Sequence, residues 1–316
     1  YTVMGWQVDP TTGNIKKDTV SALRVMQTSN LTSPPEATTQ ANVSGIIDKN
    51  DKDVLSDKGL VKTLTFFDNL GYSYTARFAM KSTGTDGKYT VELEKILNSD
   101  GTTFYDPETS NVDLSDIFGA KTTNATLGTY SQVQSGYYYD SANDNFYVGS
   151  DANGTKISWD PATNSFTDGQ TPATTYSLKQ VYGIPDAMVS KIANKQATAA
   201  IKNGTLTITG DVTDYAIDFS TKDGTFTGVG ARTSNNKTNT VTLNMSKLGN
   251  NPTQFDDITI DFSGLKDADN GGKSTAVMST GSIDDGVTGK GKKLGAMIGI
   301  SIDNNGLITG TYDNGN

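Results

Sequence analysis

The stretch Leu60-Val61-Lys62-Thr63-Leu64-Thr65-Phe66-Phe67, followed by Asp68-Asn69-Leu70-Gly71 and then by Tyr72–Met80, decides the fold class. In the first run Leu60, Leu64 and Phe66 fall on one face, because successive side chains of a strand point to opposite faces. The four residues that follow match a hairpin loop with glycine in the left-handed conformation. The stretch therefore predicts two antiparallel strands joined by a tight turn.

Similar strand-sized runs, separated by turn residues such as Asp303-Asn304-Asn305-Gly306, recur along the chain. The further predicted strands are Tyr1–Val8, Ser21–Met26, Tyr89–Ile96, Thr205–Thr209, Tyr215–Phe219, Thr240–Met245, Ile258–Phe262, Ala296–Ile302 and Leu307–Tyr312. Helix signals are few: a segment from Pro185 to about Ile201, and a short turn at Leu114–Phe118. The patterns predict an all-β protein with at most one or two short helices.

Length and composition indicate several thin domains. The chain has 316 residues, of which 34% are hydrophobic, and single cores stop growing at roughly 250–300 residues. We therefore expect two or three β-sandwich or barrel-like domains. Turn-rich segments at Gln27–Thr39, Thr102–Leu114 and Asp267–Ser274 are predicted boundaries, the last as a flexible connector. An aromatic, Asn/Gly-rich block from about Asp106 to Gly210 is interpreted as an inserted domain.

Several function classes are excluded or disfavoured by composition. The chain contains no Cys and no His, which removes thiolate nucleophiles, the commonest general base and the commonest zinc ligands. A net charge of −9 disfavours nucleic acid as a partner. No run of 18 apolar residues predicts a membrane span, and no signal peptide is visible. Because the chain begins within a strand-like run and without Met, we expect it to be a fragment.

Two tryptophans are candidate binding residues. Trp6 and Trp159 each precede an Asp-Pro turn, at Asp9-Pro10 and at Asp160-Pro161. An exposed tryptophan beside polar groups can stack on a sugar ring, whereas an aromatic residue next to such a turn commonly fills the core at the end of a strand. The second interpretation is favoured for both. The run Tyr137-Tyr138-Tyr139 presents the same choice between a binding platform and core packing, and packing is again favoured.

Acidic groups are the remaining candidates for catalysis or metal binding. Glu92 and Glu94 share one strand face and have a spacing that an inverting glycosidase could use, but a solvated face is the favoured interpretation. Asp267–Gly272 departs from the EF-hand pattern, because its fifth and twelfth places hold Gly271 and Met278. The Asp/Asn-rich segment Asp140–Asp151 has no specific ligand spacing. No catalytic, cofactor-binding or metal-binding residue is therefore predicted.

Four stretches, in the same order along the chain, resemble the bacterial flagellar hook protein family. They are Tyr1–Trp6 with its Asp-Pro-Thr-Thr-Gly loop, the hairpin in Val61–Phe78, Ile258–Leu265, and Met297–Gly310 with Tyr312-Asp313-Asn314-Gly315. Phe67 and Tyr72 depart from the family's hairpin, which has Tyr and Asn at those places. The resemblance covers roughly residues 1–100 and 213–316 and leaves the middle block without a match.

The resemblance implies three domains nested by insertion. An inner β-domain would comprise residues 1–38 and 267–316, a middle β-domain residues 39–105 and 213–266, and an inserted outer domain residues 106–212. The long terminal helices of hook subunits have no counterpart here, so the chain would be a central fragment. No cofactor is implied.

The implied function is mechanical. Copies of the chain would assemble into a curved, flexible tube that transmits motor torque to the filament. The partners would be other copies, the distal rod, the hook cap and the hook–filament junction proteins, with no nucleic acid and no membrane. The location would be extracellular, after export by the flagellar type III apparatus. The alternative expectation is a cell-surface adhesin or carbohydrate-binding module, and a carboxylate glycosidase is a third hypothesis.

Overall fold

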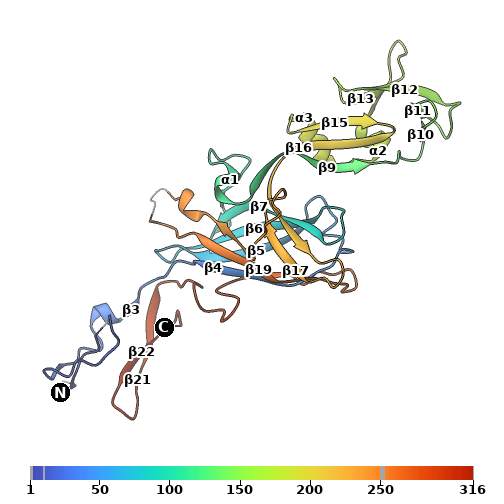
Figure 1. Cartoon of the computed structure of the whole chain (residues 1–316). Coiled ribbons are helices and arrows are strands. Elements are labelled where there is room, and N and C mark those ends of the chain that lie inside the picture. The colour runs from blue at the N-terminus through green and yellow to red at the C-terminus, as the bar shows by residue number, and fades with distance from the viewer. Residues whose placement is uncertain (1–2, 10, 250–252, 316) are drawn as a thin grey trace.

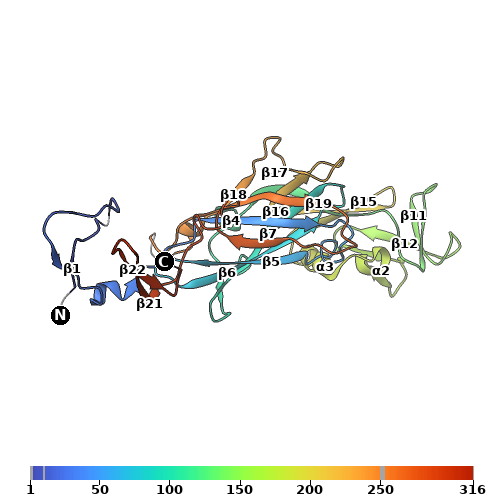
Figure 2. The same cartoon turned by 90° about the horizontal axis from the view of Figure 1, so that it is seen from below.

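The computed structural model describes residues 3–9, 11–249 and 253–315 (Figure 1). Strands predominate, and the described residues include three short α-helices. The chain is all-β and folds into a terminal arm, a middle body and an outer body, which follow one another in this order along an elongated molecule (Figures 1 and 2).

The middle body is a sandwich of two sheets. One sheet contains β5 (Leu60–Phe67), β6 (Ser73–Ser82), β7 (Lys88–Asn98), β8 (Thr103–Tyr105), β17 (Phe226–Gly230) and the end of β16 (Thr205–Phe219). The other has the order β18 (Thr240–Leu243), β19 (Ile258–Asp267), β4 (Gln40–Ile47) and β20 (Val277–Thr280). Strands β4 and β19 pair in parallel, whereas the neighbouring pairs are antiparallel.

Alternating apolar residues from both sheets form the core of the middle body. Ile258, Ile260 and Phe262 of β19 are fully buried, and so are Ala76 and Phe78 of β6. The ring of Phe78 packs edge-on against Phe118, which follows α1 (Leu114–Ile117). A short 3-10 helix, η2 (Met245–Lys247), also contributes to this core.

The outer body has a separate core. A five-stranded meander contains β10 (Tyr137–Asp140), β11 (Asn145–Val148), β12 (Thr155–Asp160), β13 (Ser165–Thr167) and β14 (Thr175–Ser177). Helices α2 (Leu178–Tyr182) and α3 (Asp186–Ala193) follow, and then β15 (Ala197–Lys202) pairs with the start of β16, whose other edge pairs with β9 (Ala120–Tyr130). Phe146, Phe166 and Tyr182 are among its buried aromatic residues.

The terminal arm, defined as residues 3–33 and 294–315, contains both ends of the described chain (Figure 1). Its elements are β1 (Met4–Gly5), β2 (Ser21–Ala22), η1 (Thr28–Asn30), β3 (Thr32–Ser33), β21 (Gly295–Ile302) and β22 (Ile308–Tyr312). Strand β21 pairs with β22 along most of its length and with β3 at only two residues.

The predicted hairpin formed by Leu60–Phe67 and Tyr72–Met80 is confirmed. Strands β5 and β6 pair from Leu60↔Met80 to Phe67↔Ser73, and Gly71 has φ +84°. The side chain of Asp68 accepts hydrogen bonds from the backbone N–H groups of Leu70 and Tyr72, which closes the turn.

The remaining strand predictions are mostly confirmed, with three differences. Of the predicted strand Ser21–Met26, only Ser21–Ala22 is a strand. Thr205–Thr209 and Tyr215–Phe219 are one continuous strand, β16, because the residues between them pair with β9. Of the predicted strand Tyr1–Val8, only Met4–Gly5 is a strand, while Tyr1 and Thr2 lie outside the described residues.

The predicted helix from Pro185 to about Ile201 is wrong in its second half. Pro185 is the N-cap, and α3 ends at Ala193. Ala197–Lys202 is instead strand β15, joined to β16 by the two-residue loop Asn203-Gly204, in which both residues have positive φ. An Asn-Gly pair is a strong hairpin signal, and the strand pairing that it permits prevails over the helix propensity of alanine.

The number of helices was also underestimated, because α2 brings the total among the described residues to three. Ser177 and Gln180 form a reciprocal capping box at its start, and Gly183 ends it in the left-handed conformation. Both features are readable from sequence. The turn at Leu114–Phe118 is confirmed as α1.

The exact division of the chain into three domains stays a prediction. Two strand pairings bear on it: β20, which begins at Val277, joins the sheet of β4, and β3 pairs with β21 in the arm. Residues 277–280 thus lie within a sheet of the middle body.

Candidate functional site

The terminal arm exposes most of its large apolar side chains. Ile298 and Ile302 of β21 are each 67% exposed, and Ile300 between them is 42% exposed. No described apolar residue of the arm belongs to either core cluster. The exposed apolar residues of the arm are Val3, Met4, Trp6, Val8, Ile15, Val20, Met26, Leu31, Leu294, Ile298, Ile300, Ile302 and Leu307.

The isoleucines of β21 are the exposed apolar side chains of a hairpin. Ile300 and Ile302 alternate along the strand, so their side chains share a face, and Ile298 lies at the register shift between Met297 and Gly299. Ile302 pairs with Ile308 of β22, which adds a further apolar side chain to that face. A two-stranded hairpin is only marginally stable by itself, and one with an apolar face normally packs against another layer. The arm is therefore the candidate interface of this molecule.

Trp6 lies in the arm and does not fill a core. Its side chain is 46% exposed, so the interpretation of Trp6 as a core residue is wrong. The turn after it is held by Asp9, whose carboxylate accepts a hydrogen bond from Thr11 N–H at 2.8 Å and pairs with Lys16 at 2.9 Å. These contacts lower the pKa of Asp9. Pro10 lies outside the described residues.

The tip of the β5–β6 hairpin forms the junction between the arm and the middle body. A Cβ atom placed on Gly71 would lie 2.9 Å from Leu294 N and 2.9 Å from Pro35 Cβ, so only glycine fits there. Thr38 Oγ1 donates to Lys290 O and accepts from Phe67 N–H, each at 3.0 Å. The hairpin tip thus meets the backbone of the arm at Leu294, and Thr38 bonds together the hairpin and the segment that leads into the arm.

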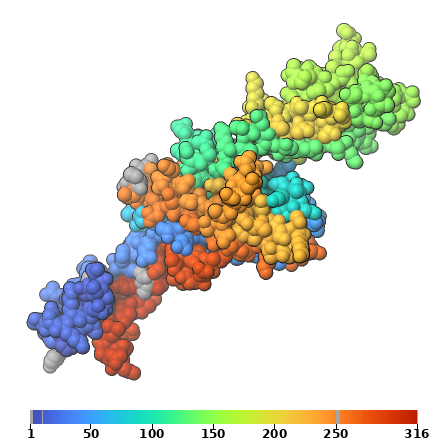
Figure 3. Space-filling model, in the orientation of Figure 1, coloured from blue at the N-terminus to red at the C-terminus, as the bar shows by residue number. Residues whose placement is uncertain are grey.

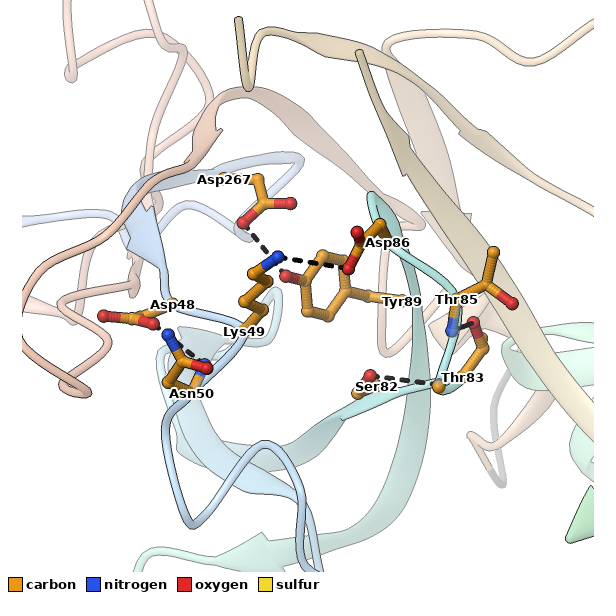
Figure 4. A network of polar contacts seen from close by, with 10 residues as sticks. Asp48, Lys49, Asn50, Ser82, Thr83, Thr85, Asp86, Tyr89 and Asp267 are labelled. Carbon is orange, nitrogen blue, oxygen red and sulfur yellow. Dashed lines mark hydrogen bonds and ion pairs between the residues drawn. The ribbon is translucent and has the colours of Figure 1, made fainter. Parts of the chain in front are cut away.

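A polar cluster lies around the end of β4, the start of β7 and the end of β19 in the middle body (Figure 4). Tyr89 donates a hydrogen bond to Asp267 at 3.0 Å, and Lys49 Nζ lies 3.2 Å from Asp86 Oδ1. Burial raises the pKa of Asp267 and that of Tyr89. Lys49, Asp86 and Asp267 line a shallow hollow of about 200 Å³.

The segment Asp267–Ser274 beside this hollow is not a flexible connector. Buried Asp48 accepts hydrogen bonds from the backbone N–H groups of Asn270 and Gly272, at 2.7 and 2.8 Å. Asp51 accepts another from Ser274 N–H. Two buried carboxylates thus hold the turn in one conformation, a long-range effect that the composition of the segment does not reveal. Hydrogen bonds from the backbone lower the pKa of Asp48.

The candidate acidic residues all have structural partners. Glu92 pairs with Lys81 and Glu94 with Arg77 across the β6–β7 pair, on a partly exposed face. In the segment Asp140–Asp151, Asp140 accepts from Ala142 N–H and Asp144 from the Tyr139 hydroxyl. No group of three acidic side chains positioned to hold a metal ion occurs among residues 3–9, 11–249 and 253–315.

The aromatic residues of the outer body divide between its two faces. Trp159 packs against Phe166, and Tyr137 and Tyr139 pack on the same core, so core packing is confirmed for these three. Tyr138 lies on the opposite face, in a row with Tyr147 and Lys156 of the next two strands. The Tyr138 and Tyr147 rings are 6.3 Å apart.

Comparison with known proteins does not place the chain in a family. No protein-family model matches it. No curated protein sequence matches it either. Within the described part of the chain, the helices are too short and too polar to cross a bilayer.

Proposed function

We propose that this chain is a non-catalytic structural subunit that self-assembles into the flagellar hook, the flexible curved tube that transmits motor torque to the filament. The observation that carries the proposal is the terminal arm: an ordered β-hairpin with an exposed isoleucine face and no core of its own. Large exposed apolar patches commonly mark protein–protein interfaces. Assembly with other copies would bury this face.

The sequence resemblance supports the same proposal, because its matching segments include elements of both the middle body and the terminal arm. Val61–Phe78 covers most of the β5–β6 pair and its connecting turn, whose tip supports the arm, and Met297–Gly310 lies in the β21–β22 hairpin. The resemblance therefore falls on both sides of the junction between arm and middle body. The outer body, which the resemblance leaves unmatched, lies at the opposite end of the molecule (Figure 3).

An open helical assembly needs a heterologous contact, in which one surface binds a different surface of the next copy. Like-charged copies approach with least repulsion where little charge is concentrated. Between Gly295 and Tyr312 the chain has no lysine or arginine and one aspartate, whereas the whole chain has a net charge of −9. The hairpin is thus an apolar, nearly neutral part of an acidic molecule. The other proposed partners are the distal rod, the hook cap and the junction proteins, outside the cell after type III export.

Immunogold electron microscopy tests the location. Antibodies raised against the chain should label a curved segment between the flagellar basal body and the filament in cells that carry the parent gene. Labelling elsewhere on the cell surface would contradict the proposal. A motility assay tests the arm: the double substitution Ile298→Ser and Ile302→Ser in the parent gene should strongly reduce swimming, whereas Leu55→Ser, an exposed apolar residue of the middle body, should not.

The alternative proposal is glycan binding by the outer body, and the row Tyr138, Tyr147 and Lys156 favours it. Two adjacent tyrosine rings on the solvent-facing side of a sheet can stack on a sugar, and a lysine beside them can donate hydrogen bonds. Glycan-array binding that is lost in Tyr138→Ala and Tyr147→Ala, and retained in Thr167→Ala on a neighbouring strand, would support this function. Trp159→Ala cannot serve as this test, because its ring lies in the core.

A further inference from the structure

The middle and outer bodies have separate cores joined by only two strands. The two core clusters share no residue, and β9 and β16 are the strands that run between them (Figure 1). Leu206 and Ile208 of β16 are buried in the outer core, whereas Ile217 and Phe219 of the same strand are buried in the middle core. A single strand thus passes from one body to the other.

The segment between these anchors is a two-stranded neck. On β16, pairing with β15 ends at Gly210 and pairing with β7 begins at Tyr215, so residues 211–214 pair with β9 alone. None of residues 121–125 or 211–213 is buried. A ribbon without a core on either face resists bending less than the sheets at its two ends.

The neck is also interrupted by a β-bulge. Between the pairs Gly210↔Ala125 and Val212↔Thr122, Asp211 faces two residues, Thr123 and Asn124. Asn124 has φ +52°, and its N–H donates to Asp211 Oδ1 at 3.2 Å. A bulge breaks the hydrogen-bond ladder and increases the local twist and bend. A second register shift follows between Ile208 and Thr209.

The middle-body end of the neck is held by an ion pair, and the outer end is anchored in the outer core. On the middle-body side, buried Asp214 forms a two-point ion pair with Arg232, with Nε to Oδ1 at 2.8 Å and Nη2 to Oδ2 at 2.5 Å. Gly119 is held at φ +105° beside it, where a Cβ atom would lie 2.9 Å from Asp214 N. On the outer side, Leu127 and Tyr130 of β9 pack against the outer core.

We infer that residues 121–125 and 211–213 form a hinge about which the outer body pivots as a rigid unit, with the Asp211–Asn124 hydrogen bond limiting the motion. Small interfaces between domains make such rigid-body motion the default, and hinges concentrate in a few residues at the ends of elements. This inference does not depend on the proposed hook function, because it rests on the pairing and burial of β9 and β16.

Pulsed electron–electron double resonance measures the distance between two spin labels and tests the hinge. Because the chain has no native cysteine, the labels can be placed by cysteine substitution alone. Thr221→Cys and Ala152→Cys label exposed positions of the middle and outer bodies. Thr221→Cys with Thr63→Cys labels two positions of the middle body and is the reference pair. We expect the distance distribution between the bodies to be at least about twofold wider than that of the reference pair.

Two variants of the neck sharpen the test. Deletion of Asn124 removes the bulge and keeps the register on both sides, so the distribution between the bodies should narrow to nearly the reference width. Asp211→Ala removes the limiting hydrogen bond and should widen it. The reference pair should be unchanged in both variants, which shows that the middle body is folded, and Trp159 fluorescence reports the outer body. A distribution between the bodies as narrow as the reference, and unchanged by both variants, would overturn the inference.

Discussion

The middle body and the terminal arm contain the same local pattern and differ in what covers it. In β19, Ile258 and Ile260 alternate with polar residues and are fully buried between two sheets. In β21, Ile298, Ile300 and Ile302 alternate in the same way and are largely exposed. Alternation therefore specifies a strand with an apolar face, whereas burial of that face requires a second layer, which the arm does not contain.

The difference predicts that stability resides in the middle body and association in the arm. Four variants test this division, and their expected effects on the free energy of unfolding decrease from Phe78→Ala to the double substitution in the arm.

The largest effect is expected from Phe78→Ala. Phe78 is fully buried, and its ring centroid lies 5.0 Å from that of Phe118. Loss of the ring leaves a cavity and should lower the free energy of unfolding of the middle body by about 3–5 kcal/mol. Urea denaturation followed by far-UV circular dichroism measures it, because both tryptophans lie outside this body. A loss below about 1 kcal/mol would contradict the assignment of the core.

Asp48→Asn should cost about 2–3 kcal/mol, because a carboxylate that accepts backbone hydrogen bonds from Asn50, Asn270 and Gly272 is replaced by an amide with one acceptor oxygen. Asp86→Asn is the matched control, since its pair with Lys49 is exposed and should contribute little.

The effect of Asp48 should depend on pH. The pKa of the Asp48 carboxyl is lower in the folded protein than in the unfolded chain. The stabilisation by the Asp48 carboxylate is therefore complete above the unfolded-state pKa and is lost as the pH falls through the folded-state pKa. The difference in unfolding free energy between wild type and Asp48→Asn should therefore shrink below about pH 4. A difference that stays constant down to pH 2 would mean that the charge of Asp48 does not stabilise the turn.

Gly71→Ala should cost about 1–2 kcal/mol, because alanine is strained at positive φ and its Cβ atom would meet the arm. Gly101→Ala is a close control: it has the same φ of +84° at a hairpin tip, with no atom within 4 Å of the added Cβ. The excess cost of Gly71→Ala measures the junction with the arm. Equal costs in urea denaturation, together with unchanged proteolysis of the arm, would mean that the junction is not tight.

The smallest effect on stability is expected from the double substitution Ile298→Ser and Ile302→Ser. Exposed side chains without packing partners contribute little, so the free energy of unfolding should change by at most about 0.5 kcal/mol. The matched control, Ile260→Ser in buried strand β19, should lower the free energy of unfolding by about 2–4 kcal/mol. Comparable losses of stability in the two variants, measured by the same denaturation, would remove the distinction between the arm and the middle body.

Much of the secondary structure was predictable because its signals are local. The alternation in Leu60–Phe67 and the turn residues Asp68–Gly71 specify a hairpin without reference to the rest of the chain. The Asn203-Gly204 pair is an equally local signal, and it contradicts the predicted extension of the helix through the alanines. The capping residues of α2 are also local signals. The candidate interface was readable only as a strand over Ala296–Ile302, because its exposure depends on a layer that is not adjacent in sequence.

Other features had no local signal at all. Buried Asp214 forms an ion pair with the partly exposed Arg232, yet neither residue indicates its partner, since the pairing depends on how β16 and the segment after β17 meet. The same holds for Asp48, since two of its three backbone donors, Asn270 and Gly272, lie more than two hundred positions away in the chain. Trp6 and Trp159 stand before similar Asp-Pro turns and have opposite environments.

The sequence by itself determined the all-β class, the positions of most strands and the turns that join them, because backbone sterics and the two-residue period of a strand act over a few neighbouring residues. The tertiary structure alone decided which apolar faces are covered, that β16 continues from one body into the other, and that the terminal arm presents a bare isoleucine face. These depend on contacts between segments far apart in the chain, which the residues of either segment do not specify.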